Sequence, residues 1–258
     1  VAYDATQAEW LRELGIDELV EGGKRVWAER AHVGDLEALA GLAVPPRALW
    51  LRALALERER IANHLGDLGY LGNDGGFAFG LAQFSRLKEE VVRTNLAAFG
   101  HRFMMDLVVP GGVARDLDRD HATAMVDEAK RVAAEVATLR GIYDEHDGLQ
   151  DRFRTCGRVT PELAARLGLV GMAGRASGQA RDLRCDFAAA PWEALAVCKA
   201  GATGGDVAAR VAVRFDELAP VVQAGSTFQS PRKRQARGVG CHLLQVASVK
   251  NMDGDIPC

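Results

Sequence analysis

Apolar residues recur at helical spacing through much of this chain, and they predict long helices as its main elements. The clearest helix is expected over 119–147, where one apolar residue follows another at spacings of four and three. This apolar seam consists of Met125, Ala129, Val132, Val136, Leu139 and Tyr143. A seam of this kind lies on one side of a helix and packs against other helices, so the pattern predicts a bundle.

Three further helices follow from the same reasoning. One is predicted over about 47–70, after Pro46, which suits the first helical position. Another is predicted over about 80–106, with apolar residues and Asn95 on one face, and a last amphipathic helix is predicted to begin at Asp206. Shorter helices are expected at 4–14, 17–31 and 35–42, and between Thr160 and Gly168. We find no convincing run of strands, so the predicted fold class is mainly α, a bundle of long helices.

The pattern divides the chain into three parts. Residues 1–43 are an N-terminal helical segment, residues 44–224 are the helical core, and residues 225–258 lack apolar periodicity. We expect this last part to be mobile and dispensable, because it offers no apolar face to bury. Within the core, the glycine-rich stretch 168–186 is expected to be a loop. Its glycines match neither phosphate-binding pattern, so nucleotide binding is not predicted there.

Composition and charge are those of an ordinary globular protein. The 258 residues are 48% hydrophobic and 26% charged, and the formal net charge of −3 gives no indication of a nucleic-acid partner. No apolar run approaches the ~20 residues of a membrane-spanning helix, so we expect any membrane association to go through partner subunits. The cysteines are scattered and form no CxxC pair, which predicts buried, reduced thiols rather than disulfides or a metal site.

A stripe of polar residues accompanies the apolar pattern of the helix at 47–70. Glu57, Arg60, His64 and Asp67 follow at spacings of three, four and three, with Asn63 beside them, so they share one side of the helix. Three interpretations remain open: an exposed face with ion pairs, a proton relay or ligand pair of His64 and Asp67, or a buried structural network. Glu57 is expected to pair with Arg60, and His64 with Asp67. Because the stripe adjoins the apolar face, we expect His64 to be buried and hydrogen-bonded at a helix–helix contact.

Charged residues also gather at the end of the glycine-rich stretch. Arg181 and Asp182 stand near Arg175 and Arg184 in the sequence, and no histidine adjoins Cys185 to activate it as a nucleophile. We interpret this group as an interface or a brace of the bundle. This second group therefore predicts neither a catalytic residue nor a metal ligand.

Several phrases of the core resemble a known family. They occur in the family's order between residues 44 and 222: ERIANHLGDLG, LAQFSRLKE, FGHRFMMDLVVPGGVARDL, ASGQARDLRCDF and GGDVAARVAVRFDEL. The stretch closely resembles the large subunit of membrane-bound, complex-I-related nickel–iron hydrogenases of the formate hydrogenlyase and hydrogenase-4 type. It resembles less closely the homologous 49 kDa subunit of NADH–quinone oxidoreductase, the quinone-site subunit of respiratory complex I.

This resemblance implies a largely helical electron-transfer subunit, peripheral on the cytoplasmic side of a membrane complex. It implies an iron–sulfur small subunit and ion-pumping membrane subunits as partners. Hydrogenases of the family hold a nickel–iron centre with two CxxC pairs, whereas the complex I members contact quinone, and the family is associated with NAD.

The chain departs from the family at the metal ligands. Both CxxC pairs are absent, and residues 1–40 and 225–258 do not resemble the family's flanking segments, so we expect a bundle that is incomplete at both ends. No catalytic residue carries over, and no cofactor is expected in this chain. The positions that match family phrases are supporting ones: Glu57, Arg60, Asn63, His64, Asp67, Arg181 and Asp182. Two functions remain open: part of the large subunit of such an oxidoreductase, incomplete alone, or a non-catalytic helical assembly module derived from it.

Overall fold

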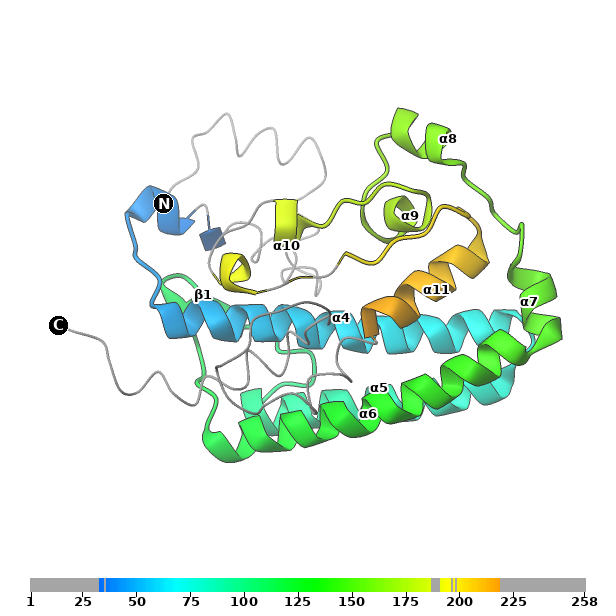
Figure 1. Cartoon of the computed structure of the whole chain (residues 1–258). Coiled ribbons are helices and arrows are strands. Elements are labelled where there is room, and N and C mark those ends of the chain that lie inside the picture. Colours follow the sequence, from blue (N-terminus) through cyan, green and yellow to red (C-terminus); the bar gives the residue numbers. More distant parts are fainter. Residues whose placement is uncertain (1–32, 35, 187–190, 196, 198, 219–258) are drawn as a thin grey trace, which may run out of the picture.

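A bundle of long helices makes up most of the structure, and the predicted fold class is confirmed (Figure 1). The computed structural model describes residues 33–34, 36–186, 191–195, 197 and 199–218. The helices expected at 4–14 and 17–31, and the tail expected to be dispensable, lie outside these residues. The division of the chain into three parts therefore stays a prediction.

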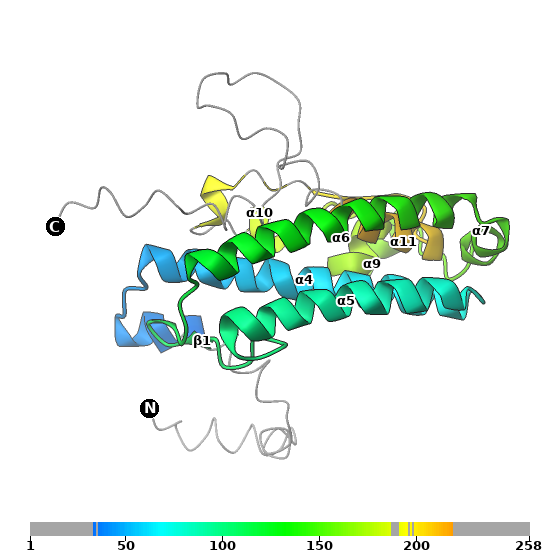
Figure 2. The ribbon, with the colours of Figure 1, turned by 90° about the horizontal axis from the view of Figure 1, so that it is seen from below.

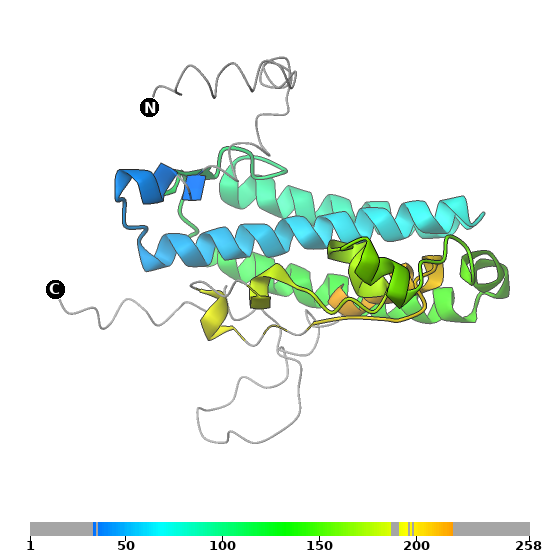
Figure 3. The same ribbon diagram turned by 90° about the horizontal axis from the view of Figure 1, so that it is seen from above.

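Three long helices lie side by side, with their axes nearly parallel. They are α4 (Pro46–Asp74), α5 (Ala78–Phe99) and α6 (Arg119–Glu145). α5 packs along both α4 and α6, and Figures 2 and 3 show the three helices extending in nearly the same direction. The shorter helix α11 (Val207–Leu218) contacts α4 and α6 as well, and it completes a four-helix arrangement.

The core lies where the apolar pattern predicts it. All members of the seam on α6 are buried, from Met125 to Tyr143. The Tyr143 ring meets the rings of Phe84 on α5 and Phe215 on α11 edge to face, with centroids 5.6 Å apart in both pairs. This aromatic contact joins three helices at one point of the core.

The helix predicted over about 80–106 ends earlier than its apolar pattern indicated. α5 stops at Phe99 because Gly100 adopts a left-handed conformation (φ 75°) and its N–H bonds to the Leu96 carbonyl. His101 therefore lies beyond the helix, where its Nδ1 accepts backbone N–H bonds from Phe103 and Met105. His101 thus stabilises the turn that follows the helix.

A small hairpin follows that turn, and the apolar pattern did not predict it. Strand β1 (Val108–Val109) pairs with β2 (Gly112–Val113) in antiparallel register. Arg52 of α4 donates to the carbonyls of Val109 and Gly112. The hairpin is too short for a strand signal, and α4 holds it in place.

The segment from residue 147 onward contains several short helices. They are α7 (Asp147–Phe153), α8 (Pro161–Arg166), α9 (Gly171–Ala176), α10 (Leu183–Asp186) and the 3₁₀ turn η1 (Trp192–Ala194). Thr160 caps α8, and Asp206 accepts a bond from the Ala209 N–H at the start of α11, as their sequence positions predict. The stretch 168–186 is not simply a loop, because it contains α9 and α10. Its glycines obscured the helical periodicity of these short turns.

No helix among the described residues is long and apolar enough to cross a membrane.

Candidate functional site

A network of buried charges joins α4 to the segment that follows α6. Glu57 on α4 is nearly inaccessible to solvent, with 2% of its surface exposed. One carboxylate oxygen, Oε2, accepts from Arg60 at 2.7 Å, which is the pair expected along the stripe. The other, Oε1, accepts from Arg184 of α10 at 2.8 Å. Glu57 therefore ties its own helix to α10.

Glu217 links its own helix, α11, to α4 and to α9. Its Oε2 contacts His64 Nε2 at 2.7 Å and accepts from Arg60 Nη1 at 2.8 Å. Its Oε1 accepts from Arg175 Nε of α9 at 2.6 Å. Because Arg60 contacts both Glu57 and Glu217, the two carboxylates belong to one connected network.

Asp182 completes the network at α10. Its carboxylate accepts two bonds from Arg184, from Nε at 2.9 Å and from Nη2 at 2.5 Å. Arg184 also lies over the Trp192 ring, 6.0 Å from its centroid. The fork of one guanidinium group thus satisfies two acids from different parts of the chain.

The network pairs three carboxylates with three guanidinium groups, and these opposite charges shift the pKa values of its acids. Burial raises the pKa of Glu57, but the charges of Arg60 and Arg184 outweigh burial and hold it below its ordinary value. Burial likewise opposes ionisation of Glu217, yet His64, Arg60 and Arg175 lower its pKa to about 2. Burial lowers the pKa of His64, so this side chain is neutral near pH 7 and donates from Nε2 to Glu217.

The structure brings together only some of the predicted site residues. Glu57, His64 and Asp182 are buried and Arg60 is half-buried within the network, whereas Asn63 is exposed. Asp67 does not pair with His64: it is half exposed and binds Arg214 at 2.8 Å. Arg181 is exposed and forms no ion pair with another described residue. His64 and Asp67 each bind a different residue of α11 instead, His64 binding Glu217 and Asp67 binding Arg214.

A second buried network lies on the other side of α4, and its signal in the sequence is weak. Arg58 has 1% of its surface exposed, and it donates to Asn95 at 2.7 Å, to the Val91 carbonyl at 2.8 Å and to Glu128 at 2.8 Å. It therefore links α4 to α5 and α6. The one available signal was Asn95, a polar residue on the apolar face of its helix.

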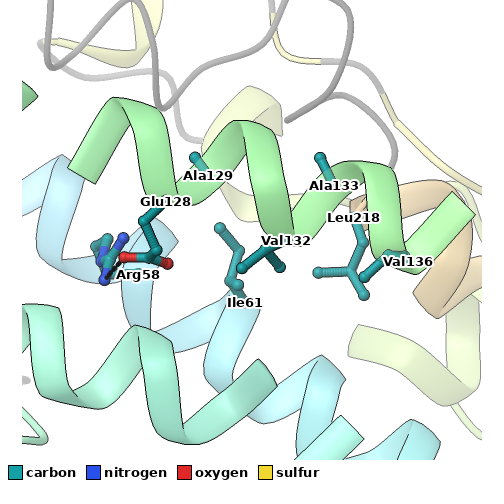
Figure 4. Close-up of a pocket in the computed structure, with 8 residues that line it drawn as sticks. All are labelled: Arg58, Ile61, Glu128, Ala129, Val132, Ala133, Val136 and Leu218. Atoms are coloured by element: carbon teal, nitrogen blue, oxygen red, sulfur yellow. Dashed lines mark hydrogen bonds and ion pairs between the residues drawn. The ribbon is translucent and has the colours of Figure 1, made fainter. Parts of the chain in front are cut away.

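A mostly apolar hollow adjoins this pair. Figure 4 shows Arg58 and Glu128 at one end and aliphatic side chains along the rest, from α4, α6 and α11. Its lining residues are Arg58, Ile61, Glu128, Ala129, Val132, Ala133, Val136 and Leu218. Both charged groups in the hollow already bind each other, so it offers an apolar surface rather than a polar binding site.

Metal ligands do not converge in the described part of the chain. No group of three or more His, Cys, Asp or Glu side chains there could hold a metal ion. Cys156 is exposed, contrary to the burial expected for it, and Cys185 is half-buried. The other three cysteines lie outside the described residues. The networks are thus suited to hold helices together, and their carboxylates and guanidinium groups are already engaged with each other.

Comparison with known families identifies a relationship that covers more than half of the chain. Residues 74–224 match the family described as the respiratory-chain NADH dehydrogenase 49 kDa subunit. The match begins at the last residue of α4 and extends past α11. It includes Arg175, Asp182, Arg184 and Glu217, the side of the network that faces α4.

Individual relatives come from hydrogenases and from NADH–quinone oxidoreductases. Formate hydrogenlyase subunit 5 of Escherichia coli is 33% identical over 188 residues, which are 73% of this chain and 33% of the relative. The carbon monoxide-induced hydrogenase of Rhodospirillum rubrum is 31% identical, over 70% of this chain and 51% of the relative. A subunit of the NADH-quinone oxidoreductase of Granulibacter bethesdensis is 33% identical, over 60% and 39% respectively. The chain thus spans between a third and a half of the length of these relatives.

A solved structure shares the fold. A chain of the membrane-bound sulfane sulfur reductase, an archaeal respiratory membrane complex, superposes with a TM-score of 0.66 and 25% sequence identity. The match covers 70% of this chain and 49% of that one. Together with the family match, these likenesses confirm the resemblance to complex-I-related hydrogenases and to the 49 kDa subunit of NADH–quinone oxidoreductase.

Proposed function

The chain belongs to the family of the respiratory-chain NADH dehydrogenase 49 kDa subunit, and from this premise we propose that it serves as the helical core of a large subunit. The parent assembly is a membrane-associated, complex-I-related hydrogenase or NADH–quinone-type oxidoreductase that transfers electrons. Its relatives in both classes support this assignment.

The observation that carries the proposal is the buried network centred on Glu57 and Glu217. It fixes α9, α10 and α11 to α4 through contacts of 2.6 to 2.8 Å between residues far apart in sequence. Buried ion pairs contribute little net stability unless their geometry is well formed, and we infer that this network serves to specify one arrangement of the elements it joins. A subunit that must hold a redox centre against a partner needs such a fixed arrangement.

Catalysis in this proposal depends on groups that other parts of the assembly supply. The sequence contains no CxxC pair, so a nickel–iron centre of the hydrogenase kind has no ligands of that pattern in this chain. Quinone contact and a link to NAD oxidation are the corresponding roles if the parent is of the complex I kind. An iron–sulfur small subunit and ion-pumping membrane subunits are the proposed partners, and the cytoplasmic face of the membrane is the proposed location.

The proposal is tested by tagging the full chain in cells that produce it and solubilising their membranes with detergent. We expect the tagged chain to migrate on native gels with a large complex that evolves hydrogen from reduced viologen or reduces quinone with NADH. Elemental analysis of the chain purified alone is expected to give less than one nickel or iron per chain. A chain found only as a free monomer, in cells whose hydrogenase and NADH–quinone activities survive its deletion, would overturn the assignment.

A further inference from the structure

Helix α8 buries one small residue, Ala164, whereas its leucine and the leucine at its C-cap are exposed. Ala164 is completely buried against the rest of the molecule, whereas Leu163 is 39% exposed and Leu167 is 63% exposed. Val170, just beyond the helix, is 63% exposed as well. A surface helix normally turns its largest apolar side chains inward. In α8 these larger side chains point outward instead, and Leu163, Leu167 and Val170 form an apolar ridge on the surface. Figure 1 shows α8 above α9, on the side away from α4.

This ridge is held firmly in place. Thr160 Oγ1 accepts from the Leu163 N–H at 3.3 Å, and Gln179 Nε2 donates to the Pro161 carbonyl at 3.0 Å. Beyond the helix, the Leu169 N–H bonds to the Ala164 carbonyl at 2.9 Å. These bonds fix the backbone that carries Leu163 and Leu167, so a partner that covers the two side chains has little backbone ordering to impose.

Positive charge surrounds the ridge. Arg158 and Arg166 are exposed, and neither guanidinium group forms a hydrogen bond or ion pair with another described residue. The net charge of the whole chain is −3, and Glu162 is the one acidic residue between Arg158 and Arg166. Exposed arginines beside exposed leucines are typical of protein interfaces, where arginine is enriched and forms strong contacts.

We propose that the apolar residues Leu163, Leu167 and Val170 dock onto a partner subunit, together with Arg158 and Arg166 beside them. These five residues are called the α8 ridge from here on, and the partner's surface offers them an apolar socket with an acidic rim. The inference rests on the proposed function in one respect, since the partner belongs to the same assembly. A protein fits better than a lipid surface, because a six-residue helix with a few apolar side chains gives too little insertion for stable membrane binding.

The test uses the full chain within the detergent-solubilised assembly and two variants of the ridge. One is Leu163→Ser/Leu167→Ser, and the other is Arg158→Glu/Arg166→Glu. Leu39→Ser is the matched control, because Leu39 is 79% exposed outside the ridge. All changes are at exposed positions, so each variant is expected to keep the urea unfolding midpoint of the unmodified chain.

We expect each ridge variant to reduce the fraction of chain that migrates with the assembly by about tenfold or more, while the control leaves it unchanged. Hydroxyl-radical footprinting is expected to show Leu167 protected in the assembly and reactive in the isolated chain. Normal assembly of both variants with a reactive Leu167 would overturn the ridge proposal and leave the proposed function intact. Failure of the unmodified chain to join any complex would instead remove the proposed function.

Two other occupants are separated by direct measurements on the isolated full chain. Sedimentation with phosphatidylglycerol vesicles tests a lipid surface, and sedimentation velocity tests a second copy of the chain. Binding or self-association that the ridge variants abolish would assign the surface to that occupant and overturn the proposal. Absence of both, together with impaired assembly, supports it.

Discussion

His64 of α4 and Glu217 of α11 meet in the buried network, with Nε2 and Oε2 2.7 Å apart, although 153 residues separate them in the sequence. Burial lowers the pKa of His64, so the imidazole is neutral and acts as donor. The same Glu217 carboxylate also holds Arg60 and Arg175. A neutral donor among charged groups satisfies the carboxylate without adding a charge that must itself be balanced.

Replacing His64 should expose the importance of this donor. We expect His64→Ala to lower the free energy of unfolding by about 1–3 kcal/mol, because a buried carboxylate oxygen loses a partner. His64→Gln keeps a donor and should cost less. Urea unfolding at pH 7 measures both. The exposed neighbour Asn63 provides the control, since Asn63→Ala should change stability by about 0.5 kcal/mol or less. Equal effects of His64→Ala and Asn63→Ala would show that the contact is unimportant for stability.

Acid should weaken the fold through Glu217. Its pKa is lowered to about 2, so the folded state holds this carboxylate ionised, and the resulting stability is present above its ordinary pKa and lost as pH falls toward 2. His64 acts in the same direction, because its lowered pKa means that the unfolded chain takes up the proton first as pH falls below about 6.5. Stability is therefore expected to decrease steadily from about pH 6.5 to pH 2.

The variant Glu217→Gln measures how much the ionised Glu217 carboxylate contributes to the free energy of unfolding. At pH 7 it should lower the free energy of unfolding by about 3 kcal/mol, the equivalent of the change in pKa. The difference from the unmodified chain should vanish near pH 2, where Glu217 itself becomes neutral. Glu89 has a similarly lowered pKa, about 2, but lies at the surface. Glu89→Gln should therefore follow the unmodified curve closely, since water screens its ion pairs. A constant offset of Glu217→Gln at all pH values would contradict the linkage.

The pair of Arg58 and Glu128 should behave as a coupled unit. Each side chain has 3% or less of its surface exposed, and they are 2.8 Å apart. Arg58→Met should destabilise by about 3–5 kcal/mol, because it leaves a buried carboxylate unpaired. Glu128→Leu should cost a similar amount. The double variant is expected to recover most of the loss, as an apolar pair replaces an ionic one beside an apolar hollow. Additive losses in a double-mutant cycle would show that the two side chains act independently.

The sequence predicts the long helices well because their signals are local. The seam from Met125 to Tyr143 repeats over several turns, and each repeat confirms the same face. The end of α5 is different, because the apolar residues continue through Phe103 and Met104 while the left-handed Gly100 turns the chain away. A single backbone conformation thus overrides a pattern that extends beyond it.

The polar residues are harder to predict, because their partners are distant in sequence. The stripe on α4 drew attention to Glu57 and His64, and the short spacing of Glu57 and Arg60 identified one real pair. Nothing local to Glu217 distinguishes it from an ordinary solvent-facing acid of an amphipathic helix. Arg58 adjoins Glu57 but lies on another side of the helix, so stripe reasoning omitted it. Both residues become recognisable only when the helices are packed.

Tyr143 offers the sharpest test of that packing. Its hydroxyl group donates to the Leu68 carbonyl at 2.8 Å and lies where a side chain on Gly72 or Gly80 would begin. We expect Gly72→Ala to destabilise by about 1–3 kcal/mol through overpacking, despite alanine's better helix propensity. Tyr143→Phe removes the obstructing oxygen and should cost about 1 kcal/mol for the lost hydrogen bond. The double variant should therefore be less destabilised than the sum of the two, as measured by urea unfolding.

Gly141 is the control, because it lies exposed on α6 with open space around it, and Gly141→Ala should stabilise by about 0.5–1 kcal/mol. If Gly72→Ala stabilises to the same extent, the Tyr143 hydroxyl does not occupy that space in solution, and the three-helix contact it marks is looser than the structure indicates.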